Sequence, residues 1–140
     1  MAPADCQPYL KRHSVTWIHV QGDIAAETLR NLGELFDLHP LAMEDVMNSG
    51  QRPKLDSYDD QEFIVVNLPE LRGGGIVTGQ ISLFYGRDYI VSFSNTADDP
   101  FEPVRKRLRT STGRFRKRGA DYLLYTLLDV VIDAGFPMFE

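Results

Sequence analysis

A chain of 140 residues, 43% hydrophobic and 25% charged, is long enough for one domain with a buried core and too apolar for a disordered polymer. Its single cysteine excludes an internal disulfide and a cysteine-based zinc cluster, and its apolar runs of at most four residues are far shorter than the ~20 that a membrane helix needs. With a net charge of −5 and no signal-peptide pattern, we expect a soluble domain in a reducing, intracellular compartment.

The first part of the chain predicts a leader, a strand and a helix. Residues 1–14 have no periodic pattern, so we expect a loose leader before a domain over residues 15–140. Residues 15–20 are rich in β-forming side chains and predict a strand. Apolar residues then recur at helical spacing, which predicts a helix over 24–37 with Asp23 as its N-cap.

A second, short helix is predicted directly after the first. The residue before a proline avoids the helical conformation, so His39 should end the first helix. Pro40 suits the first turn of a new helix, predicted over 41–48, and Gly50 should close it in the left-handed conformation.

The middle of the chain is rich in predicted strands. β-Branched and aromatic residues predict strands over 55–58 and 62–68. A glycine turn leads into a third strand over 76–85, and the loop 86–88 joins it to a fourth over 89–94. Apolar residues alternate in the last two strands, which makes this hairpin the clearest local pattern in the chain.

The last third of the chain predicts two helices. Residues 101–109 form a basic pattern, and residues 120–136 are apolar nearly all round, so the second helix must be buried on several sides. Helices before and after a run of strands predict an α/β domain in which a sheet is flanked by helices.

The sequence offers no catalytic motif. A nucleophile elbow, a paired-histidine metal motif and a phosphate-binding loop are all missing, so we expect no enzyme. His13, His19 and His39 are scattered and do not set the ligand spacing of a zinc site.

Two pairs of carboxylates are candidates for binding a cation. Glu44 and Asp45 follow Pro40 and would either favour the positive end of the helix dipole or supply oxygen ligands to a hard cation. Asp129 and Asp133 stand four apart on the terminal helix, as a solvated stripe or at a subunit interface where a cation or a basic partner offsets their charge.

A basic tract over residues 105–118 holds eight of the fifteen Lys and Arg residues and no acid. It would serve as an anion- or nucleic-acid-binding surface, with Phe101 and Phe115 available for stacking. The alternative is a solvated face whose positive charges pair with acids elsewhere in the chain or in a partner. Because nucleic-acid-binding domains are usually basic and this chain is acidic, we expect no nucleic-acid partner.

Seven short segments stand out by their order and spacing. They are WIHV (17–20), FDLHPLAMEDV (36–46), QRPKL (51–55), FIVV (63–66), QISLF (80–84), FEPVRKRL (101–108) and RGADYLLYTLLD (118–129). Together they resemble the cytosolic domain of the CorA family of divalent-cation transporters, over nearly the whole chain.

The resemblance implies an α/β/α sandwich with a mixed β-sheet, assembled as a homopentamer. It also implies that a stalk helix and two transmembrane helices follow residue 140, so we expect a soluble piece of a transporter at the cytoplasmic face of the inner membrane. Regulatory sites in this family bind Mg²⁺ between subunits. By position, the ligands would be Asp45, with Glu44 beside it, and Asp129 as a further acid, and a stalk carboxylate would complete the site.

We therefore expect the cytosolic regulatory domain of a CorA-like magnesium/cobalt transporter, which senses divalent cations and helps gate ion transport. Mg²⁺ is the expected regulatory cation, bound weakly by the isolated domain, with Co²⁺, Ni²⁺ or Zn²⁺ as alternatives. The alternative from another class is a soluble anion- or nucleic-acid-binding module that uses the tract 105–118.

Overall fold

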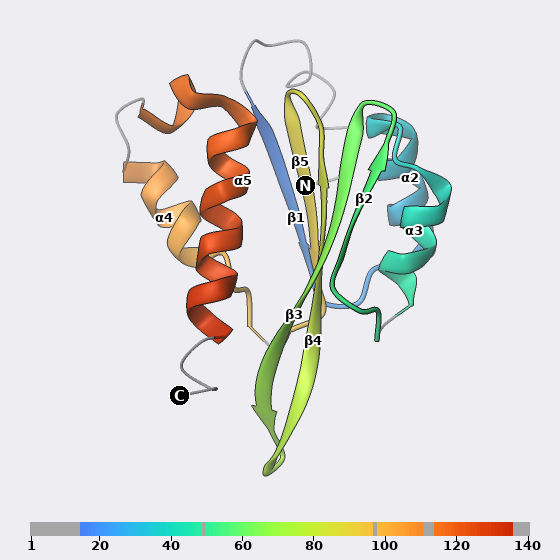
Figure 1. Ribbon diagram of the computed structural model, residues 1–140, viewed down its shortest axis with the longest axis vertical. Helices are drawn as coiled ribbons and strands as arrows, with labels where there is room; N and C mark the ends of the chain where they lie inside the picture. The colour runs from blue at the N-terminus through green and yellow to red at the C-terminus, as the bar shows by residue number, and fades with distance from the viewer. Residues whose placement is uncertain (1–14, 49, 97, 111–113, 136–140) are drawn as a thin grey trace.

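One mixed β-sheet organises the molecule. The computed structural model describes residues 15–48, 50–96, 98–110 and 114–135. Five strands lie in the order β1-β5-β4-β3-β2, with β1 parallel to β5 and the other neighbouring pairs antiparallel (Figure 1). The strands are β1 (Thr16–Gln21), β2 (Lys54–Tyr58), β3 (Gln61–Arg72), β4 (Gly75–Tyr85) and β5 (Tyr89–Ser94).

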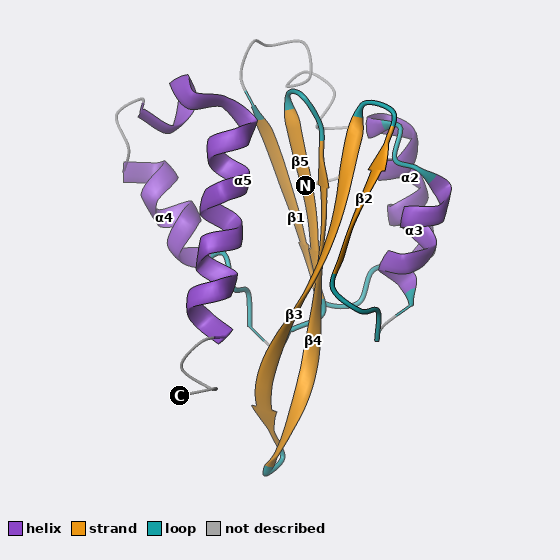
Figure 2. Ribbon diagram, in the orientation of Figure 1, coloured by secondary structure: helices purple, strands orange, loops and turns teal. Residues whose placement is uncertain are grey.

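Helices cover both faces of this sheet. The helices α2 (Ala26–Phe36) and α3 (Pro40–Met47) lie on one side, and α4 (Glu102–Thr110) and α5 (Arg114–Gly135) lie on the other (Figure 2). The layers are therefore α/β/α, which confirms the predicted sandwich with a mixed sheet.

Alternation of side chains along the strands divides the apolar residues into two cores. The core beneath α2 and α3 contains Leu29, Leu32, Phe36, Leu38, Ala42, Phe63, Val65, Phe84, Val91 and Phe93. The core beneath α4 and α5 contains Leu68, Ile81, Leu83, Ile90, Phe101, Val104, Leu123, Leu127 and Val131. The sheet is thus buried on both faces, and each helical layer packs on its own set of side chains.

Two helices begin two or more residues away from the start that the sequence predicts. Helix α2 begins at Ala26, and its N-cap Ala25 makes no side-chain hydrogen bond, so the predicted N-cap Asp23 is wrong. Helix α5 begins at Arg114, six residues before the predicted start at 120, because Arg and Lys are good helix formers even without an apolar period. The leader 1–14 lies outside the described residues.

The hairpin of β3 and β4 is longer than predicted and projects past the helices (Figure 1). Strand β3 continues four residues beyond the predicted end at 68, through Pro69, which pairs with Thr78. Strand β2 pairs only as far as Val65, so Pro69 lies where β3 has no neighbour on that side. A proline is tolerated in such an edge segment because no ladder hydrogen bond is lost.

Candidate cation-binding site

Glu44 and Asp45 lie in the second turn of α3. The helix begins at Pro40, and the preceding His39 caps it through Nδ1, which accepts a hydrogen bond from the Leu41 N–H at 3.2 Å. The first turn contains no acid, so the expectation that both carboxylates favour the positive end of the helix dipole is wrong. Towards a C-terminal end the dipole disfavours negative charge, and the helix itself does not account for these carboxylates.

A lysine ammonium group lies against Asp45. Nζ of Lys54, the first residue of β2, contacts Oδ2 of Asp45 and lies 3.3 Å from Oδ2 of Asp56. The side chains of Lys54 and Asp45 are 32% and 21% exposed. The hydrogen bond to Asp45 raises the pKa of Lys54, so the ammonium group is charged at neutral pH. This corner of the domain therefore already holds a positive charge beside Asp45.

Two buried glutamines hold α3 at its two ends. At the C-terminal end, Nε2 of Gln80 donates to the carbonyl oxygen of Asp45 at 3.0 Å, and Oε1 of Gln80 accepts from the Gln51 N–H at 2.9 Å. At the N-terminal end, Oε1 of Gln61 accepts from the His39 N–H at 2.9 Å. The sequence analysis missed both roles. Gln80, which precedes the largely apolar run 81–85 of β4, is a visible signal of such a clamp, whereas Gln61 stands between acidic residues at the start of β3.

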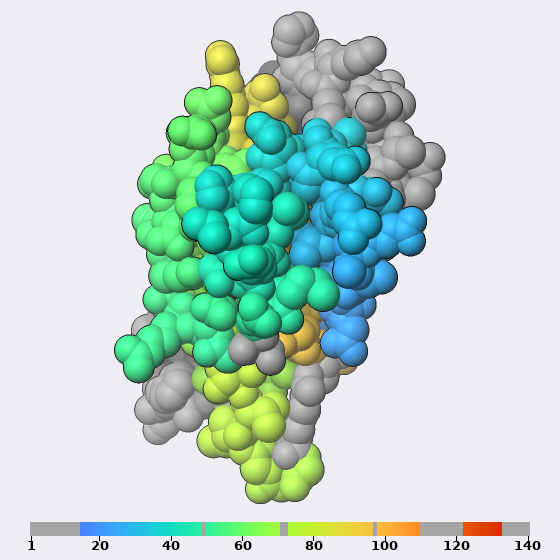
Figure 3. All heavy atoms as spheres, turned by 90° about the vertical axis from the view of Figure 1, so that its right-hand side faces the viewer, coloured from blue at the N-terminus to red at the C-terminus, as the bar shows by residue number. Residues whose placement is uncertain are grey.

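Glu44 is exposed at the rim of a groove between α2 and α3. The groove has a volume of about 820 Å³, and its lining includes Leu29, Arg30, Met43 and Met47. The two helices lie side by side on this face, with the tip of the β3–β4 hairpin beyond them (Figure 3). The carboxylate of Glu44 is thus open to solvent close to Asp45 in the same helix turn.

Asp129 lies far from these two residues. It is exposed on α5, on the opposite side of the sheet from α3 (Figure 1). One copy of the chain therefore does not bring Asp45 and Asp129 into a common site. The side chain of Asp133 lies outside the described part of α5.

The donor set on α3 suits a hard cation only in part. Among the described residues, no three His, Cys, Asp or Glu side chains come close enough to hold a metal ion. Mg²⁺ keeps several waters and is commonly bound through one or two carboxylates. Asp45 and Glu44 fit that number of ligands, whereas a closed site needs donors from elsewhere.

The basic tract is split between two helices and partly neutralised. Arg105 contacts Asp99 and lies 3.3 Å from Glu102, and Arg109 donates to Glu102 at 2.8 Å. These pairs support the interpretation that the basic side chains of the tract pair with nearby acids. Nothing in the described part of the chain supports the alternative of an anion- or nucleic-acid-binding module.

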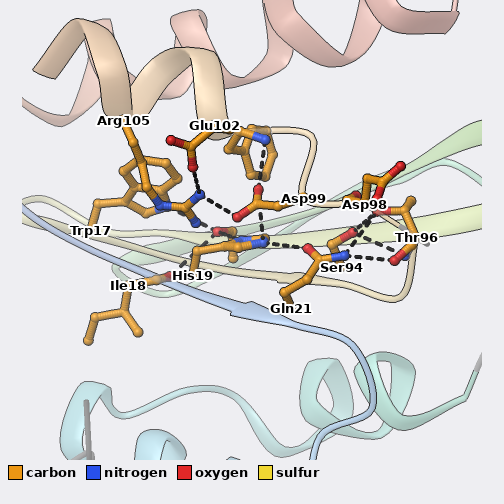
Figure 4. A network of polar contacts seen from close by, with 12 residues as sticks. Trp17, Ile18, His19, Gln21, Ser94, Thr96, Asp98, Asp99, Glu102 and Arg105 are labelled. Atoms are coloured by element: carbon orange, nitrogen blue, oxygen red, sulfur yellow. Dashed lines mark hydrogen bonds and ion pairs between the residues drawn. The ribbon is translucent and has the colours of Figure 1, made fainter.

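A second polar network joins β1 and β5 to the start of α4 (Figure 4). His19, whose side chain is 3% exposed, lies between Ser92 Oγ, 2.6 Å from Nδ1, and Gln21 Oε1, 2.8 Å from Nε2. Asp99 Oδ1 lies 3.6 Å from Nε2 of His19 and accepts from the Phe101 N–H at 2.8 Å. The network fixes the loop that leads into α4.

The hydrogen bonds around His19 fit a neutral tautomer that carries its proton on Nε2. The amide nitrogen of Gln21 donates to Thr96, so its oxygen faces His19 and accepts from Nε2–H. In this tautomer Nδ1 accepts from the hydroxyl of Ser92, which also lies 3.5 Å from the carbonyl oxygen of Ile18 and accepts from Trp17 Nε1 at 3.0 Å. Burial lowers the pKa of His19, with opposing contributions from Gln21 and Asp99, so the histidine is neutral in the folded state at neutral pH.

The fold is that of the soluble domain of a CorA transporter. The structure of that domain from Methanocaldococcus jannaschii is similar with a TM-score of 0.66 and 19% sequence identity, over 84% of this chain and 47% of the other. The model of the family described as CorA-like Mg²⁺ transporter protein matches residues 12–140, and the chain belongs to this family.

Two curated relatives agree with this assignment. The chain is 36% identical to the cobalt/magnesium transport protein CorA of Thermotoga maritima and 33% identical to the putative metal ion transporter YfjQ of Bacillus subtilis. These matches cover 95% and 87% of this chain but only 38% and 37% of the relatives. Within the part of the chain that is described, no helix is long and apolar enough to cross a membrane.

The glutamine clamp predicts a local loss of stability. Gln80→Leu should reduce the free energy of unfolding by about 2 kcal/mol, because two backbone groups lose a partner and a buried unsatisfied group costs about 1–3 kcal/mol. Urea denaturation measures this loss. Amide hydrogen exchange should be faster at the C-terminal end of α3, whereas Gln61→Leu should affect its N-terminal end. Equal protection of α3 in Gln80→Leu and the unsubstituted chain would contradict the assigned role.

Burial of His19 predicts a pH dependence of stability. Because the pKa of His19 is lower in the folded state, the unfolded chain binds more protons than the folded chain as the pH falls. The contribution of His19 to stability is therefore present above pH ~6.5 and is lost as the pH falls below that value. Chemical denaturation between pH 7.5 and 5 should give a shallower decline for His19→Gln than for the unsubstituted chain. Parallel declines would show that His19 takes up a proton in the folded state without cost.

Proposed function

We propose that this chain is the cytosolic regulatory domain of a CorA-type magnesium/cobalt transporter, and that Asp45, with Glu44 beside it, binds the sensed cation. The observation that carries the proposal is the position of Asp45, a partly exposed carboxylate that the helix dipole does not favour and that already lies against the ammonium group of Lys54. Membership of the CorA-like family and the names of the two curated relatives support a role in metal-ion transport.

The proposed assembly is a homopentamer in which the domain joins its own stalk and transmembrane helices at the cytoplasmic face of the inner membrane. The domain has a binding role and no catalytic one. One chain offers Asp45 and Glu44 on one side of the sheet and Asp129 on the other. A site that uses acids from both sides therefore has to form between neighbouring subunits.

The proposed mechanism is linkage between cation binding and assembly. A cation shared by acids of two subunits stabilises the arrangement in which those acids are close together. When the cation leaves, repulsion between the carboxylates favours separation of the subunits, and the transporter opens. The domain contributes rigidly placed carboxylates because Gln61 and Gln80 hold α3 at both ends.

Mg²⁺ is the proposed regulatory cation, because carboxylates and water are the ligands that it prefers. Co²⁺ and Ni²⁺ are the next candidates. Zn²⁺ is less suited to Asp45 and Glu44, because its usual sites include nitrogen or sulfur ligands.

Isolated from its partners, the chain should bind Mg²⁺ only weakly, with a dissociation constant in the millimolar range. Half a site offers one or two carboxylates and leaves most of the coordination to water. A titration followed by amide NMR should shift resonances of α3 and β2 in the unsubstituted chain and leave them in place in Asp45→Asn. Asp129→Asn is the matched control and should leave the α3 shifts unchanged. Micromolar affinity, or equal shifts with Asp45→Asn, would contradict the proposal.

In a transporter that carries this domain, Asp45→Asn should weaken inhibition by internal Mg²⁺ without unfolding the domain. The substitution keeps the side-chain shape and removes one partly exposed ion pair, which is worth about 0–1 kcal/mol. Ion flux measured against internal Mg²⁺ gives the regulatory effect, and thermal unfolding of the domain gives the structural one. Intact Mg²⁺ inhibition combined with marked destabilisation would mean that Asp45 has a structural role only.

A further inference from the structure

We propose that Lys54 is a resident competitor for the divalent cation at Asp45, so that cation binding there is an exchange of the Lys54 ammonium group for the metal ion. This inference rests on the proposed function of Asp45 and adds a residue that sets the affinity of the site. With Lys54 in place, the site binds the divalent cation more weakly than its carboxylates alone would.

The backbone places Lys54 where it competes. Lys54 pairs with Val65 as the first residue of β2, and Lys54, Asp56 and Tyr58 share one face of this strand by alternation. Nζ reaches the carboxylate of Asp45 across the gap between β2 and α3 and lies 5.9 Å from the centre of the Phe63 ring. A cation that approaches the contacted oxygen of Asp45 meets this ammonium group.

The same geometry gives Lys54 a second partner. Oδ2 of Asp56 lies 3.3 Å from Nζ, and the Asp56 side chain is 38% exposed. When a metal ion takes Asp45, the ammonium group can stay with Asp56 and turn towards water on its flexible four-carbon stem. Displacement of Lys54 therefore leaves no buried, unpaired charge, and the exchange is reversible.

The charges show what the exchange does to affinity. Lys54 carries one positive charge between Asp45 and Asp56, so the ammonium group offsets one of the two negative charges that a cation meets there. Removing it should strengthen the attraction for a divalent ion. A sensing site that is always saturated cannot respond to changes in cation concentration. By weakening cation binding, the Lys54 ammonium group shifts the response to higher cation concentration.

The test compares Mg²⁺ titrations of the whole 140-residue chain and its variants by amide NMR at constant ionic strength. Lys54→Gln should lower the dissociation constant read from α3 resonances by about three- to tenfold, the range expected for one partly exposed charge. Lys54→Arg retains the charge and should stay within twofold of the unsubstituted chain. Lys106→Gln removes one charge from an exposed position of α4, on the opposite side of the sheet, and should also stay within twofold.

The outcomes separate this inference from the proposed function. If Lys54→Gln binds as weakly as the unsubstituted chain while Asp45→Asn abolishes the α3 shifts, the site stands and the role of Lys54 is wrong. If neither the unsubstituted chain nor Lys54→Gln shows Mg²⁺-dependent shifts in α3, both are wrong. The double variant Asp45→Asn/Lys54→Gln should lose the increase in Mg²⁺ affinity that Lys54→Gln gives alone. If the increase persisted in the double variant, the proposed exchange at Asp45 would be wrong. Dispersed spectra and a cooperative thermal unfolding transition confirm that each variant is folded.

Discussion

Alternation of side chains across the β4–β5 hairpin is the constraint on which the rest of this structure depends. Phe84 and Val91 pack towards α2 and α3, and Leu83 and Ile90 pack towards α4 and α5. Because both faces of the central strands are apolar, neither helical layer is optional, and the sheet is stable only between the two. This arrangement also decides the functional geometry, since it separates the acids of α3 from Asp129 by the full thickness of the sheet.

The polar residues of the sheet use the same alternation to fix the two helical layers. Gln80 points towards α3 and holds the Asp45 carbonyl, whereas Ser92 points the other way and ends a chain of hydrogen bonds through His19. Each of these side chains is buried and satisfied, so moving a helix would leave polar groups unpaired at a cost of about 1–3 kcal/mol each. The carboxylates of α3 are therefore presented on a rigid frame and not on a loose surface helix.

The Asp45–Lys54 pair joins stability to the proposed sensing role. A partly exposed ion pair contributes little to folding, so the domain can release it without losing its structure. The same pair governs how strongly a second cation is attracted to Asp45. A site that must exchange its cation needs an ion pair of this kind, which matters little for folding and strongly affects the local charge.

The sequence by itself determined the types of nearly all elements, the β4–β5 hairpin and the start of α3 to within one residue, because apolar periodicity and proline geometry act within a few residues. It also singled out Glu44 and Asp45 as neighbours on one helix, although it misplaced them in the first turn. Only the tertiary structure decided that Asp45 meets Lys54 and that Gln80 reaches back across 35 residues to the α3 backbone. These contacts depend on the position of α3 on the sheet. That position is set by the packing of side chains from strands that are distant in the sequence, and a local sequence pattern does not record this packing.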